Sequence, residues 1–142
     1  MTAFERGLSA TQALADQEPT NNSWQARLRV AHRNLGNAWK KRGDLVRALE
    51  HYRKALDIAE QRATQDSKDS DAQQALIEAL TNVAETQEER GEAGQAAAAF
   101  GRALERAEAL LARDPSQPSW VQATSKLRKK VATCCKKHRA RR

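Results

Sequence analysis

Apolar residues recur at steps of three and four along most of this chain, the spacing that places them on one face of an α-helix. Between positions 24 and 42 they stand at Leu28, Ala31, Leu35 and Trp39. No stretch shows the alternating apolar and polar residues of a β-strand bounded by turns. Helix breakers and polar stretches separate the periodic segments, at positions 19–22, 43–44, 66–71, 91 and 115–118. The pattern predicts an all-α fold with helices at 3–16, 24–42, 45–65, 72–90, 93–113 and 120–138.

The starts of four of these helices offer capping residues. A short side chain with an oxygen atom accepts hydrogen bonds from the first backbone N–H groups of a helix, which have no partner inside the helix. We therefore expect N-caps at Ser23, Asp44, Asp71 and Ser119.

The chain also repeats itself with a period of 48 residues. Residues one period apart match in type, as do Gly43 and Gly91, Ala48 and Ala96, Tyr52 and Phe100, and Ala55 and Ala103. A shift of two periods places Trp24 on Trp120 and Phe4 on Phe100. Such self-similarity predicts a stack of helix pairs, each of which buries its apolar face against the next.

Each copy resembles a tetratricopeptide (TPR) repeat. The resemblance is carried by Leu35-Gly36, Trp39, Gly43, Ala48, Tyr52 and Ala55, and by Val83-Ala84, Gly91, Ala96, Phe100 and Ala103. It covers nearly all 142 residues and implies a right-handed helical-repeat solenoid of antiparallel helix pairs, with about six helices. Two features depart from the family: the period exceeds the usual ~34 residues, and Gln87 stands where a large aromatic residue is usual. The long period is similar to that of a bacterial class of TPR arrays.

The phase of the repeat predicts the domain organisation. Residues 1–142 form a single TPR-like domain with a half repeat at 3–16, repeats at 24–65 and 72–113, and a half repeat at 120–138 that carries a basic end at 126–142. Neither end shows the polar capping helix that solenoids need. Two interpretations stay open: a segment of a longer array, or a short protein that covers its end helices by forming a homo-oligomer.

Charge and composition limit the function classes. The net charge is +7, but it is banded: residues 27–54 hold nine Lys or Arg and two acids, and residues 126–142 hold nine bases and no acid. No apolar run approaches the ~20 residues of a membrane span, and the N-terminus lacks the apolar stretch of a signal peptide. The two cysteines are adjacent, which excludes a disulfide framework and favours a cytoplasmic, reducing location.

Little in the sequence points to catalysis. There is no nucleophile–base pattern, no phosphate-binding glycine loop and no metal motif of family-grade spacing, so we expect no enzyme activity, no cofactor and no metal. The three histidines are unclustered in sequence. Cys134 or Cys135 with His138 would make half a metal site, but Cys135 aligns with Trp39, which favours a packing role. Trp24 and Trp120 likewise favour packing at helix starts.

The candidate binding residues come from the first helix of each pair, which lines the concave groove in TPR proteins. Arg33, Asn37, Asn82, Lys126 and Lys130 resemble the clamp with which co-chaperone TPR domains grip the C-terminal carboxylate of a peptide. Lys40 and Lys41 extend this basic face. Bases neutralise an anion and amides donate to it, although Glu78 and Glu85 on the middle helix would repel one. The alternative is a banded face of ion pairs, in which Lys40 and Lys41 meet Glu88 and Glu89, which in turn meet Lys136 and Lys137.

These observations favour a non-enzymatic scaffold that binds a peptide or protein partner in its groove, the partner carrying acidic residues or a free C-terminus. One alternative is a basic adaptor that binds nucleic acid through the C-terminal helix by neutralising phosphates. Another is a regulatory or assembly segment of a larger protein.

Overall fold

The computed structural model describes residues 3–140, with side chains from Glu5 to Cys134. Within residues 3–140 there are six helices and no strand, so the predicted all-α fold is confirmed. The helices are α1 (Ala3–Gln17), α2 (Asn22–Lys41), α3 (Leu45–Gln65), α4 (Ser70–Glu89), α5 (Ala93–Arg113) and α6 (Pro118–Ala140). In this described part no helix is long and apolar enough to cross a membrane.

The helix starts differ from the sequence prediction by two residues in α2, α4 and α6. Asp44 caps α3 as expected, because its carboxylate accepts from the backbone N of Arg47 at 3.0 Å. Asn21 caps α2 and Asp69 caps α4, each accepting from two backbone N–H groups. These residues offer side-chain oxygens one half-turn earlier than expected, and Pro118 suits a first helical turn since it has no N–H to satisfy. Three predicted caps are therefore wrong and lie inside helices: Ser23, Asp71 and Ser119.

The turns after α2 and α4 are two copies of one glycine motif. Gly43 and Gly91 have φ angles of 82° and 81°, a conformation that glycine adopts without steric cost. In each turn the glycine N–H and the N–H of the next residue bond back to carbonyls in the last turn of the helix. This arrangement satisfies carbonyls that have no helical partner, and it reverses the chain within a few residues.

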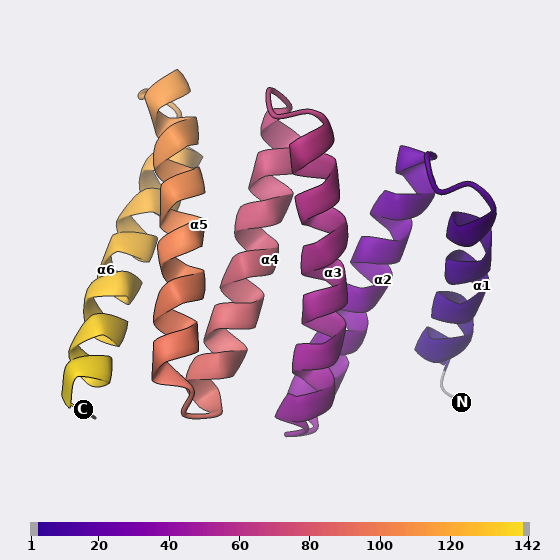
Figure 1. Cartoon of the computed structure of the whole chain (residues 1–142), viewed down its shortest axis with the longest axis horizontal. Coiled ribbons are helices and arrows are strands. Elements are labelled where there is room, and N and C mark those ends of the chain that lie inside the picture. The colour runs from indigo at the N-terminus through magenta and orange to yellow at the C-terminus, as the bar shows by residue number, and fades with distance from the viewer. Residues whose placement is uncertain (1–2, 141–142) are drawn as a thin grey trace.

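The six helices form one row in which each helix packs against its neighbours in sequence (Figure 1). Small residues lie where helices meet: Ala48, Ala84 and Ala96 are each 0% exposed. A Cβ atom added to Gly36 would lie 2.6 Å from the Tyr52 ring, so α2 and α3 approach closely at this glycine. Tyr52 and Phe100, which match across the repeat, are both buried, and the side chain of Phe4 lies outside the described residues.

Candidate functional site

Helices α2, α4 and α6 border two depressions that lie one repeat apart. The first, here called the closed slot, lies between α2 and α4 over α3 and is lined by Arg29, Arg33, Tyr52, Ala55, Glu78, Ala79 and Asn82. The second, here called the open groove, lies between α4 and α6 over α5. Its lining residues are Ile77, Thr81, Glu85, Glu88, Phe100, Ala123, Lys126, Leu127, Lys129, Lys130 and Thr133.

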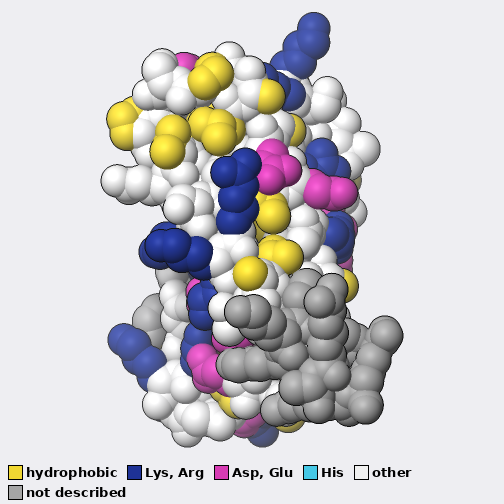
Figure 2. Space-filling view, turned by 90° about the vertical axis from the view of Figure 1, so that its left-hand side faces the viewer, with side chains coloured by type: hydrophobic (Ala, Val, Ile, Leu, Met, Phe, Trp, Pro, Cys, Tyr) yellow, Lys and Arg dark blue, Asp and Glu magenta, His cyan; other side chains and the backbone are white. Residues whose placement is uncertain are grey.

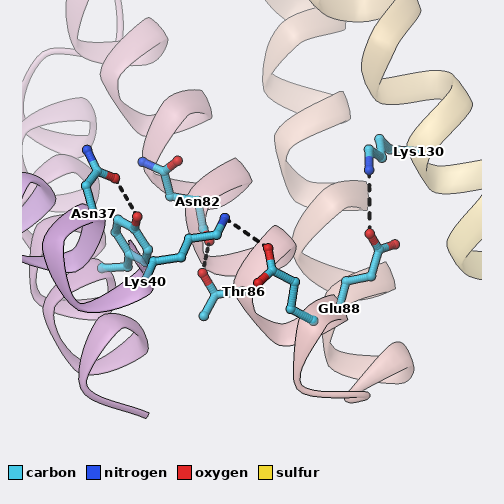
Figure 3. Close-up of polar contacts among 8 residues, drawn as sticks. Asn37, Lys40, Asn82, Thr86, Glu88 and Lys130 are labelled. Carbon is cyan, nitrogen blue, oxygen red and sulfur yellow. Dashed lines mark hydrogen bonds and ion pairs between the residues drawn. The ribbon is translucent and has the colours of Figure 1, made fainter. Parts of the chain in front are cut away.

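The closed slot is filled by its own side chains. Arg33 reaches across to α4, where its Nη1 lies 3.0 Å from Oε1 of Glu78. The Tyr52 hydroxyl donates a hydrogen bond to Oδ1 of Asn37 (Figure 3). Burial raises the pKa of Tyr52, with a further contribution from the nearby carboxylates of Glu85 and Glu89. No room for a water molecule is left between these groups.

The open groove has a volume of about 450 Å³. Ile77, Phe100 and Leu127 make its lining mainly apolar, and Phe100 is 0% exposed. Lys130 lies at the rim, with its Nζ 3.5 Å from Oε1 of Glu88 (Figure 3) and 5.8 Å from the centre of the Phe100 ring. The other carboxylate oxygen of Glu88 accepts from Sγ of Cys134 at 3.0 Å.

Equivalent positions explain why one depression is filled and the other is open. Arg33 of the closed slot corresponds to Thr81 of the open groove, one period along the chain. Thr81 is short, and its hydroxyl donates to the backbone oxygen of Ile77 in its own helix at 2.8 Å. No side chain at this position therefore crosses the open groove as Arg33 crosses the closed slot.

The two walls of the open groove differ in charge. On α4, Glu85 forms no ion pair with any described side chain, whereas Glu88 is paired with Lys130. On α6, Lys126 and Lys129 are exposed and have no carboxylate partner among the described side chains. The surface seen from the α6 end of the row shows Lys and Arg side chains close to hydrophobic ones (Figure 2). The groove thus combines an apolar floor, a basic wall and an acidic wall.

The structure divides the predicted clamp residues between the two depressions. Arg33 and Asn82 line the closed slot, and Asn37 is bonded to Tyr52 in that slot. Lys126 and Lys130 line the open groove. The five residues do not face a single cavity, and Arg33, Asn37 and Lys130 each have a partner within the chain.

Ion pairs link α2, α4 and α6, and one of them, Lys40–Glu89, is a pair that the alternative interpretation of this face expected. Lys40 Nζ lies 3.2 Å from Oε1 of Glu89 (Figure 3), in addition to the pairs Arg33–Glu78 and Lys130–Glu88. Lys41 is exposed. The side chains of Lys136 and Lys137 lie outside the described residues. Pairs of this kind are partly exposed, and each contributes only ~0–1 kcal/mol to stability.

Two histidines that looked isolated in the sequence meet in the fold. Nδ1 of His32 in α2 lies 3.1 Å from Nδ1 of His51 in α3, and the rings stack with centres 5.4 Å apart. His32 is 3% exposed. Burial, helped by the nearby His51 and Lys54, lowers the pKa of His32 to about 4. The two histidines are 19 residues apart in sequence and meet because the turn at Gly43 folds α3 back on α2.

The cysteine region carries no metal site among the described residues. No group of three His, Cys, Asp or Glu side chains there has a geometry that could hold an ion. Cys134 is 1% exposed and contacts Glu88. The side chains of Cys135 and His138, which belonged to the alternative half-site, lie outside the described residues.

The sequence interpretation named Lys126 and Lys130 as binding residues but missed the apolar and short side chains of the open groove: Ile77, Thr81, Ala123, Leu127 and Thr133. The sequence contains one indication of this groove: the first repeat has Arg33, whereas the second has the shorter Thr81 at the equivalent position. Its effect depends on which side chains face each other across neighbouring helix pairs, so the sequence did not reveal it.

Comparison with known proteins corrects the family assignment. Residues 22–139 match the model of a family described as "Protein of unknown function (DUF2753)". The TPR assignment is wrong, since the matching model is that of DUF2753 and not of a TPR family. No curated protein matches the chain.

Proposed function

This chain belongs to the DUF2753 family of proteins of unknown function, and we propose that it is a non-enzymatic interaction module that holds a peptide segment of a partner protein in the open groove. The observation that carries this proposal is the contrast between the two depressions. The closed slot leaves no room for water, whereas the equivalent open groove has a volume of about 450 Å³.

The size and chemistry of the open groove suit a short segment. Ligand sites commonly have volumes of roughly 300–1,000 Å³ and combine a mainly apolar lining with a few polar groups that fix orientation. Ile77, Phe100 and Leu127 supply the apolar surface, and the charged residues of α4 and α6 supply the polar groups. The groove lies between two helices on the surface, so a segment within a longer partner chain can enter it sideways.

The proposal includes a right-handed solenoid of stacked helix pairs as the scaffold. It is supported by the single row of helices in Figure 1 and by the repeated glycine turns at Gly43 and Gly91. In such a scaffold each pair contacts mainly its neighbours, so a groove between two successive pairs is held by rigid helices.

The test compares the natural chain with a variant whose open groove is closed. Thr81→Arg combined with Lys126→Glu reproduces the pair Arg33–Glu78 at the equivalent positions of the open groove. Peptides are selected from a random display library on the natural chain, and their dissociation constants are then measured on both proteins. We expect the double variant to lose at least about tenfold in affinity, the effect of removing ~1.4 kcal/mol.

Thr64→Arg is the matched control, because it places the same side chain on an exposed helix position outside both depressions. This control is expected to bind the selected peptides as the natural chain does, and circular dichroism checks that all variants are equally helical. Peptides that bind the closed-groove variant as well as they bind the natural chain would refute the open groove as the site.

A further inference from the structure

We propose that the open groove recognises a segment in which an apolar side chain is flanked by carboxylates, and that Lys126 and Lys129 hold the carboxylates. This inference rests on the proposed function and specifies the chemistry of its ligand. It depends on three features of the groove: its apolar floor, its basic wall on α6, and the charged side chains that have no ion-pair partner within the described part of the chain.

The floor selects the apolar part of the ligand. Phe100 and Leu127 are almost fully buried from solvent by their neighbours, yet both line the groove together with Ile77. An apolar side chain that enters the groove removes its own surface from water against these residues, and full burial of a leucine-sized side chain contributes roughly 1.5–3 kcal/mol. A polar side chain in the same place would lose its hydration without finding a hydrogen-bond partner on this floor.

The α6 wall selects the charge of the ligand. Lys126 and Lys129 have no carboxylate partner among the described side chains, whereas Lys130 is already engaged by Glu88. After that pairing, α6 offers two unneutralised ammonium groups to the groove and α4 offers one carboxylate, that of Glu85. The two charges on α6 outnumber the one on α4, so an acidic ligand is favoured over a basic one.

The positions of the charges also orient the ligand. Carboxylates that approach α6 meet Lys126 and Lys129, while carboxylates that approach α4 meet Glu85 and are repelled. The acidic side chains of the ligand therefore face α6 and lie away from Glu85.

The closed slot lacks this combination. Glu78 occupies the position equivalent to Lys126, and its carboxylate is paired with Arg33. Ala79 stands where the open groove has Leu127. The closed slot therefore pairs the carboxylate of Glu78 within the chain, and the open groove keeps two lysines for an external partner.

The probes are three fluorescent hexapeptides with blocked ends, so that only side chains carry charge. One has a central leucine pair flanked by glutamates, the second has lysines in place of the glutamates, and the third has serines in place of the leucines but keeps the glutamates. Dissociation constants are measured by fluorescence anisotropy on the full chain. We expect the first probe to bind at least about tenfold more tightly than either of the others, since a charge-assisted contact or a buried leucine is each worth that factor.

Charge variants of the groove assign the contacts. The double variant Lys126→Glu and Lys129→Glu is expected to reverse the preference, so that the lysine probe binds more tightly than the glutamate probe. Glu85→Gln is expected to strengthen the binding of the glutamate probe by up to about fivefold, the factor that corresponds to an exposed charge pair. Lys68→Glu, in the connection between α3 and α4, is the matched control and should leave the preference unchanged.

The possible results separate this inference from the proposed function. One result is that the lysine probe binds best and that its binding is lost in the variant with Thr81→Arg and Lys126→Glu. In that case the inference is wrong and the proposed function stands. If the glutamate probe binds but the double variant Lys126→Glu and Lys129→Glu leaves the preference between the probes unchanged, the inference is wrong as well. If none of the probes binds while library peptides depend on the open groove, only the inference fails; if no peptide of either kind depends on the groove, both fail.

Discussion

The closed slot and the open groove occupy equivalent places in successive repeats, with Tyr52 and Phe100 at the same position in each. The difference between them lies in the side chains that cross from one first helix to the next. Arg33 meets Glu78 across the closed slot, whereas Thr81 and Lys126 leave the open groove unfilled. A repeated backbone can therefore carry a side-chain contact in one copy and an open groove in the next, because side-chain length and charge are independent of the repeat geometry.

A second difference lies in the packing behind the two depressions. The first pair buries titratable groups, among them His32, which stacks on His51, and the Tyr52 hydroxyl, which bonds to Asn37. The second pair has Leu80 in place of His32 and Phe100 in place of Tyr52. The first pair should therefore respond to pH, and the second should not.

The largest effect that we predict is a loss of stability in acid that depends on His32. Its folded-state pKa of about 4 lies below the ordinary value of 6.5, so the unfolded chain takes up a proton at a pH at which the folded chain does not. Stability then falls as the pH drops below 6.5 and stops falling below about 4, by up to roughly 3 kcal/mol. Urea unfolding between pH 7.5 and 4 measures this dependence.

His32→Leu is the matched variant, because it gives the first repeat the residue that the second has at Leu80. Its stability should change less between pH 7.5 and 4 than that of the natural chain, with a residual change from His51, whose pKa burial also lowers. An equally steep dependence in this variant would show that His32 does not control the acid response.

The next effect tests whether the two repeats are packed equally tightly at their equivalent alanines. Ala48 and Ala96 are each 0% exposed, so Ala48→Leu and Ala96→Leu should each overpack a helix contact and cost ~1–3 kcal/mol. The urea midpoints of both variants are compared with that of the natural chain. Similar losses would indicate that the repeats differ in their grooves and not in this contact, and unchanged midpoints would contradict the tight pairing.

The smallest effect concerns the ion pair that closes the slot. Arg33→Thr gives the first repeat the residue of the second, and it removes the pair with Glu78, in which both side chains are partly exposed. The cost in stability should be only ~0–1 kcal/mol. A loss above about 2 kcal/mol in urea unfolding would mean that Arg33 supports the core and does not merely fill the slot.

The TPR assignment failed for a physical reason. Gly36 and Ala84 are small where two helices meet, and Tyr52 and Phe100 fill the adjoining space. Any pair of helices that pack this closely needs small residues at the contact. The pattern therefore indicates close helix packing and does not by itself identify a family. The match to DUF2753 rests on residues 22–139 as a whole.

The sequence by itself determined the six helices and the repeated turns at Gly43 and Gly91, because these depend on residues close together in the chain. It placed three helix starts two residues late, since Asn21 and Asp69 compete with later residues as caps. Only the tertiary structure decided that His32 meets His51, that Arg33 closes one depression and that Thr81 leaves the other open. These outcomes depend on the lengths and charges of side chains that face each other across helices 19 to 45 residues apart in sequence, which a local pattern does not specify.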